Sequence, residues 1–332
     1  MKPSRPMAVL LVLVLLSANI PLSAGDNKKK DVDSIGDRKV AHRSIISQEK
    51  EIAAGKQYAT EIDHTAKMVT DPVVNEFVNR LAQNLARNSD LTIPLTVKVI
   101  DDPSLNAFAL PGGFLYVNSG LVLAADEEAQ VAGVIAHEIA HAAARHWASQ
   151  MTKATLLQYI MIPLIFVPMS YPVYLGASQA LNFGIPIAFM KFSRSAEAEA
   201  DMLGLQYMYK AGYDPSAYVS FFSKIIEQDR RSPGSVPTVF ASHPPTPERI
   251  VASEKEIKEI LPKKEQYLVS TSEFDDVKGR LQSIMTMKKT DKKEGPTLRK
   301  REAADTTTTD SQTSGKGKDD GEDKPPVLRR RD

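Results

Sequence analysis

One short motif in this chain of 332 residues has the residue types and the spacing needed for metal-assisted hydrolysis. The segment His137-Glu138-Ile139-Ala140-His141 carries two imidazoles four residues apart. At about 100° per residue in an α-helix, His137 and His141 lie about 40° apart on one face and can bind the same ion. Glu138 lies about 100° from His137, where its carboxylate can reach a water on that ion. We therefore expect His137 and His141 to be zinc ligands and Glu138 to be a general base.

The alternative is a pair of exposed helix histidines beside a solvated glutamate. The residues around the motif are mostly apolar, which predicts a buried helix. An unpaired, charged Glu138 would be costly to bury there, so the metal interpretation is favoured.

A catalytic zinc needs a third protein ligand, and the nearest histidine does not fit. On a continuous helix His146 would lie about 180° from His137. The long metzincin pattern requires a glycine at position 144 and a histidine at position 147, where the sequence has Ala144 and Trp147. The third ligand is therefore expected from another segment.

The acidic segment 195–201 is the best source of that ligand. Its alanine-rich spacing predicts a helix in which Glu197 and Asp201 share a face, while Glu199 points away. One carboxylate can bind the ion while the second accepts the outer N–H of a zinc histidine. Composition alone leaves open that these are three solvated acids on a surface helix.

The motif and its flanks resemble the gluzincin peptidase family of the CAAX prenyl endopeptidases and the bacterial periplasmic loipins, in its soluble periplasmic branch. The similar segments are Asn106 to Gly113, HEIAH, FSRSAEAEAD, and Ser242-His243-Pro244-Pro245 with Arg249. The resemblance covers roughly residues 47 to 281. It implies one zinc per chain, protein or peptide substrates, and cleavage within misfolded or unassembled envelope proteins.

The resemblance also implies roles for three residues. Glu197 would be the third zinc ligand and Asp201 would support the site. His243 would either bind zinc in a resting form or steady the transition state. Arg249 is expected on a helix surface, and the alternative is that it helps to polarise a carbonyl. The chain departs from better-known relatives because it has no recognisable repeat domain after the catalytic region and no cysteine for a lipid anchor.

The chain divides into four predicted parts. Residues 1–24 resemble a signal peptide, with a positive start and a short apolar run, although an uncleaved anchor is the alternative. Residues 25–46 are expected to be flexible, 47–287 to form the peptidase domain, and 288–332 to be a disordered charged tail. We expect an exported protein, periplasmic by resemblance, with the outer membrane as a second possible location.

The predicted fold class is α+β, a zincin-like and mostly helical domain with a small sheet beside the HExxH helix. Apolar spacing predicts helices between 47 and 88, a strand within 91–101, and two short strands around a turn within 108–117. Asp126 is expected to cap a helix that runs to about Ser149. Further helices are expected at 193–211, 215–228 and 247–260.

Charge and apolar content limit the partners. The formal net charge of +1 gives no indication of a nucleic-acid partner, and the oligomeric state is left open. The apolar segment 154–190 is interrupted by prolines and glycines, so it predicts a hairpin over the cleft or a peripheral membrane contact. Two rival functions remain: a zinc-stabilised holdase or assembly factor that does not cleave, and a membrane-associated prenyl-protein endopeptidase.

Overall fold

The computed structural model describes residues 29–165, 192–231 and 243–293. The predicted signal peptide, the apolar residues 166–190 and the tail from 294 lie outside these ranges. The chain forms one compact unit up to Lys288 and a second unit from Lys289 onward. The helices are α3 (Gln48–Thr65), α4 (Pro72–Arg87), α5 (Ser119–Ala124), α6 (Glu128–Ala143), α7 (His146–Ile165), α10 (Arg194–Ala211), α11 (Ser216–Arg231), α12 (Pro247–Ile260) and α13 (Ser272–Lys293).

A three-stranded sheet of β1 (Thr96–Ile100), β2 (Ala107–Leu110) and β3 (Phe114–Asn118) has the order β1-β3-β2. β1 pairs parallel with β3, and β2 pairs antiparallel with β3. The predicted hairpin around Pro111-Gly112-Gly113 is confirmed. β2 is an edge strand of the described sheet, so one side of its backbone is not used by β3.

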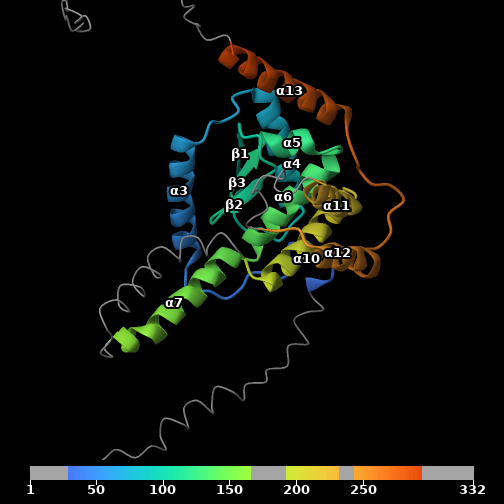
Figure 1. The fold of residues 1–332 in the computed structure, drawn as a ribbon. Coiled ribbons are helices and arrows are strands. Elements are labelled where there is room, and N and C mark those ends of the chain that lie inside the picture. The colour runs from blue at the N-terminus through green and yellow to red at the C-terminus, as the bar shows by residue number, and fades with distance from the viewer. Residues whose placement is uncertain (1–28, 166–191, 232–242, 294–332) are drawn as a thin grey trace, which may run out of the picture. The chain divides into compact units, whose positions relative to one another are not determined.

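Helix α6 carries the HExxH motif through the middle of this fold, between the sheet and the helices α10, α11 and α12 (Figure 1). It contacts α4, α10, α11 and β2, and every residue of it except Ala142 is buried. Most residues of α6 are apolar, and a helix with apolar side chains around most of its circumference is stable where neighbouring elements cover it. The α+β, zincin-like fold class is thereby confirmed.

Two glycines allow other helices to approach α6 closely. A Cβ on Gly204 of α10 would lie 3.1 Å from the backbone nitrogen of His137 on α6. A Cβ on Gly133 of α6 would lie 3.1 Å from the Cβ of Tyr218 on α11. Both distances are tighter than normal packing allows, so glycine at these positions sets how near α10 and α11 come to the motif.

Both predicted ends of the motif helix are wrong. Glu127 has the N-cap position, because Asp126 instead forms an ion pair with Lys224 and donates its backbone N–H to Gln130.

The helix also ends at Ala143 rather than near Ser149, because Arg145 has a φ of 55° and turns the chain before α7 begins. This left-handed conformation costs a non-glycine residue roughly 1–2 kcal/mol. Hydrogen bonds from Arg145 to Glu51 and to the Ile46 carbonyl hold the turn.

The segment predicted to be flexible, 25–46, is packed against the domain over its described part. Val32 and Val40 are buried, and Arg38 forms a buried ion pair with Asp90 at 2.9 Å. These contacts contradict the expectation for residues 29–46. The polar composition of this segment gave no sign of these contacts. Its few apolar side chains are widely spaced, and Arg38 is neutralised by Asp90, 52 positions away.

Within the described ranges, no helix combines the length and the apolar character that crossing a bilayer requires.

Candidate metal centre

Four side chains from three parts of the chain meet at one point on α6. His137 and His141 come from α6, Glu197 from the first turn of α10, and His243 from the residues before α12. One ligand atom from each lies within 4.8 Å of those of the other three, and all four residues are buried. The structure therefore brings together the three predicted metal ligands and His243.

The geometry of these atoms fits a metal ion. The Nε2 atoms of His137 and His141 are 3.1 Å apart, and each lies 3.5–3.6 Å from a Glu197 carboxylate oxygen. Tetrahedral zinc ligands at normal bond lengths lie about 3.3 Å from one another. Glu197 Oε2 is buried and makes no hydrogen bond of good geometry with the described residues, although Arg249 Nη1 lies 3.0 Å away. Two imidazole nitrogens and one such carboxylate oxygen are a donor set typical of catalytic zinc.

Asp201 supports His137 from the outer side of the imidazole. Its Oδ1 lies 3.0 Å from His137 Nδ1, and the Tyr218 hydroxyl of α11 donates to the same oxygen. Arg249 of α12 donates to both Asp201 oxygens at 2.6 and 2.8 Å. This network holds the His137 ring with Nε2 facing Glu197.

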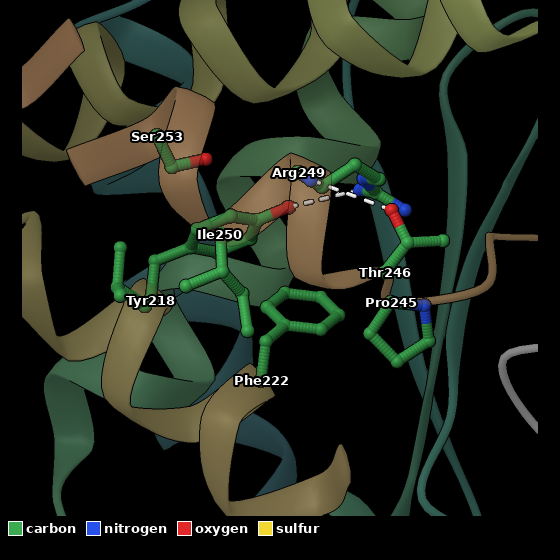
Figure 2. A pocket seen from close by; sticks show the side chains of 8 residues that line it. Tyr218, Phe222, Pro245, Thr246, Arg249, Ile250 and Ser253 are labelled. Atoms are coloured by element: carbon green, nitrogen blue, oxygen red, sulfur yellow. Dashed lines mark hydrogen bonds between the residues drawn. The ribbon is translucent and has the colours of Figure 1, made fainter. Parts of the chain in front are cut away.

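The sequence had indicated a surface position for Arg249, and this prediction is wrong. Arg249 also donates to the carbonyls of His243 and Pro244 at 3.2 and 3.1 Å, which ties the residues before α12 to the centre. Figure 2 shows Arg249 at the start of α12 near Thr246, whose hydroxyl accepts the Arg249 backbone N–H and caps the helix. The guanidinium carbon lies 5.6 Å from the centre of the Phe222 ring of α11.

The electrostatics of the pocket favour a positive charge. Burial lowers the pKa of His137, but hydrogen bonds with Asp201 and Glu197 outweigh it and raise the pKa to about 9. Burial raises the pKa of Asp201, but Arg249 and His137 outweigh it and lower the pKa to about 2. Burial, followed by the charge of His137, lowers the pKa of His141, which favours the neutral ring that binds metal. The acids are ionised and stabilise a cation between them.

Glu138 is held beside the four-residue cluster by the sheet. The Ala109 backbone N–H of β2 donates to Glu138 Oε2 at 3.0 Å. The other carboxylate oxygen lies 3.8 Å from His243 Nε2. The carboxylate is buried and close to the edge strand, as a base acting on a peptide in the cleft would need to be.

His243 lies against the predicted ligands rather than apart from them. Its Nδ1 lies 2.7 Å from Glu197 Oε1, and its ring centre lies 4.7 Å from that of His141. Phe192 stacks on His141 with ring centres 4.3 Å apart. His243 and Phe192 therefore both lie against His141, and their own ring centres are 5.5 Å apart.

Sequence reasoning missed three contributors to this region. Tyr218 is a single tyrosine in a helix, and no local pattern distinguishes it from a core residue. His146 was set aside on the assumption of a continuous helix, but the turn at Arg145 places its Nδ1 2.9 Å from His141 Nδ1. Glu199 points away from the ion as expected, yet it contacts His146 and His42. The third histidine within ten residues was the available signal.

Known proteins are similar to this chain over much of its length. The model of Peptidase family M48 matches residues 70–257, more than half of the chain. A putative beta-barrel assembly-enhancing protease of Vibrio cholerae is 30% identical over 265 residues, covering 78% of this chain and 54% of that protein. The beta-barrel assembly-enhancing protease of Escherichia coli is 29% identical over 218 residues, 64% of this chain and 45% of that protein.

A second group of relatives matches a shorter stretch. The mitochondrial metalloendopeptidase OMA1 of Arabidopsis thaliana is 37% identical over 129 residues, 39% of this chain and 25% of that protein. The chain spans about half the length of the two bacterial relatives.

Proposed function

The chain belongs to peptidase family M48, and from that premise we propose that it is a zinc-dependent endopeptidase. The observation that carries the proposal is the meeting of His137, His141 and Glu197 beside Glu138 in a buried, acidic pocket. His137, His141 and Glu197 would hold one zinc per chain. A zinc ion held there would supply Lewis acidity, which would polarise a carbonyl and make water more acidic.

The residues of the chain account for the remaining chemistry. Glu138 takes the proton from the attacking water and passes it to the leaving amine. The Ala109 N–H keeps one Glu138 oxygen in place, so the carboxylate stays oriented through both transfers. Asp201 holds the proton on His137 Nδ1, which leaves Nε2 free to act as a ligand.

The substrate is proposed to bind as an added strand at the edge of β2. The contact between Ala109 and Glu138 places this edge directly beside the general base. An extended peptide pairing there uses main-chain hydrogen bonds, which suits a protease that accepts many unfolded sequences. The alternative is that β2 has a purely structural role.

We propose misfolded or unassembled cell-envelope proteins as the substrates. The bacterial relatives are named for enhancing beta-barrel assembly, and this name supports the proposal. The signal-like residues 1–24 support export, and the periplasm, with the outer membrane as a second location, is the compartment that fits. Peripheral membrane contact through 154–190 remains part of this proposal, and among the described residues Leu156, Leu157 and Tyr159 of α7 are exposed.

Metal analysis tests the centre itself. We expect the purified wild-type chain to contain one zinc, and Glu197→Ala and His137→Ala to lose it, because each removes one of three protein ligands. The loss in affinity should exceed the roughly 10–100-fold that follows removal of a supporting hydrogen bond. Zinc content by elemental analysis is the measurement, with the exposed His64→Ala as a control. Full zinc retention in Glu197→Ala would refute the ligand assignment.

His243 is proposed to hold the enzyme in a resting form. It is buried, lies against Glu197 and Glu138, and can bind the ion as a fourth ligand. His243→Ala should therefore raise the rate on an unfolded substrate such as casein, since the fourth position becomes free for water. The rate and KM of wild type and variant are compared. A fall of about a hundredfold would instead assign His243 to stabilising the transition state.

A further inference from the structure

We propose that His146 and Glu199, assisted by His42, are positioning residues that fix the ring orientation and the proton of His141. The four side chains form a hydrogen-bonded chain, called here the His141–Glu199 relay. The inference rests on the proposed metal centre, because it concerns how one of the metal ligands is held.

The relay is continuous from the centre to the edge of the domain. His146 Nδ1 lies 2.9 Å from His141 Nδ1, and His146 Nε2 lies 3.3 Å from Glu199 Oε2. His42 Nε2 lies 2.6 Å from the same Glu199 oxygen, and Lys29 pairs with the other. His141 and His146 are both only 4% exposed, so each ring depends mainly on these protein partners.

The number of protons on each neutral ring determines which nitrogen of the relay donates and which accepts. His141 Nε2 faces His137 Nε2 and Glu197, so this nitrogen is the one directed at the metal. Its Nδ1 then carries the proton and must donate it, and the atom in front of it is His146 Nδ1. His146 Nδ1 must therefore accept. The single proton of neutral His146 is left on Nε2, where it is donated to Glu199.

A second metal site at His42, His146 and Glu199 is the competing explanation. One ligand atom from each lies within 4.8 Å of the others, and the described residues leave a cavity of about 390 Å³ beside them. However, a metal on His146 Nε2 would force the proton of that ring onto Nδ1. Two N–H donors would then face each other at 2.9 Å while His141 binds its own metal. With the first centre filled, the geometry favours a proton on His146 Nε2.

The relay gives each acid of the 195–201 segment a separate task. On α10, Glu197 faces the metal, and Asp201, one turn later, reaches His137 directly. Glu199 lies about 200° from Glu197 and cannot touch His141. The turn at Arg145 places His146 between His141 and Glu199. His141 is therefore connected to a carboxylate as His137 is, but through the His146 imidazole.

Zinc affinity measures this role without relying on catalysis. The full chain is compared with His146→Ala, His146→Asn and Glu199→Gln by competition with a chromogenic zinc chelator, with circular dichroism to verify folding. We expect His146→Ala to weaken zinc binding roughly 10–100-fold. His146→Asn should recover part of the loss, because its amide oxygen can accept from His141 Nδ1. Glu199→Gln should lose about tenfold, because an amide is a weaker acceptor than a carboxylate. The exposed His64→Asn should match wild type.

Each contrary result has a distinct meaning. Zinc affinity within twofold of wild type in a folded His146→Ala overturns the relay. If His146→Ala does not fold, wild-type affinity in both His146→Asn and Glu199→Gln overturns it. Two zinc ions per wild-type chain, falling to one in His146→Ala, would replace the relay with a second metal site. A wild-type chain that binds no zinc would refute the proposed function itself.

Discussion

Glu138→Gln is expected to reduce peptide-bond hydrolysis by at least 10²–10⁴-fold while the fold and the zinc content stay unchanged. The amide has the shape of the carboxylate, and its oxygen can still accept the Ala109 N–H. It cannot take a proton from water at neutral pH, so only the proton transfer is lost. Casein cleavage and zinc content, measured on the same preparations, test the two halves of this expectation.

The matched control is Glu61→Gln, which makes the same chemical change at an exposed position of α3. It should cleave casein at the wild-type rate. Casein cleavage at the wild-type rate by Glu138→Gln would refute the mechanism. A wild-type chain that binds unfolded proteins without cleaving them would favour the holdase, for which a base beside the metal has no use.

Arg249→Ala is expected to be the most destabilising single substitution near the centre, costing about 3–5 kcal/mol in the metal-free protein. Arg249 is a largely buried cation that contacts both Asp201 and Glu197, and its side chain is 14% exposed. Removing it leaves two carboxylates buried beside each other. Bound zinc should offset part of this loss, because a divalent cation neutralises the same charges. Urea unfolding with and without a chelator measures both effects.

Arg80→Ala is the control for the loss of an arginine as such. Arg80 pairs with Glu273 on the surface, where the two side chains are 49% and 53% exposed. An exposed pair contributes about 0–1 kcal/mol, so this variant should unfold close to wild type. If Arg249→Ala costs no more than Arg80→Ala, the guanidinium is not the group that stabilises Asp201 and Glu197.

Local periodicity in the sequence determined much of the centre. His137, Glu138 and His141 are set by the 100° step of one helix, and the pairing of Glu197 with Asp201 follows from the same step in another. The hairpin at 108–117 follows from the turn that a proline and two glycines predict between two short strands. These features depend on residues a few positions apart, so one sequence is enough to predict them.

Tertiary structure alone decided which distant side chains complete the centre. Tyr218 reaches Asp201 because Gly133 lets α11 approach α6, and no pattern within α11 encodes that contact. Arg249 looked like a surface residue because the carboxylates that it contacts are 48 or more positions away. His146 was misplaced because helical phase cannot be extended through the left-handed turn at Arg145. That turn depends on a tertiary contact between Arg145 and Glu51, 94 residues earlier. The same turn places His146, and with it the relay, against His141.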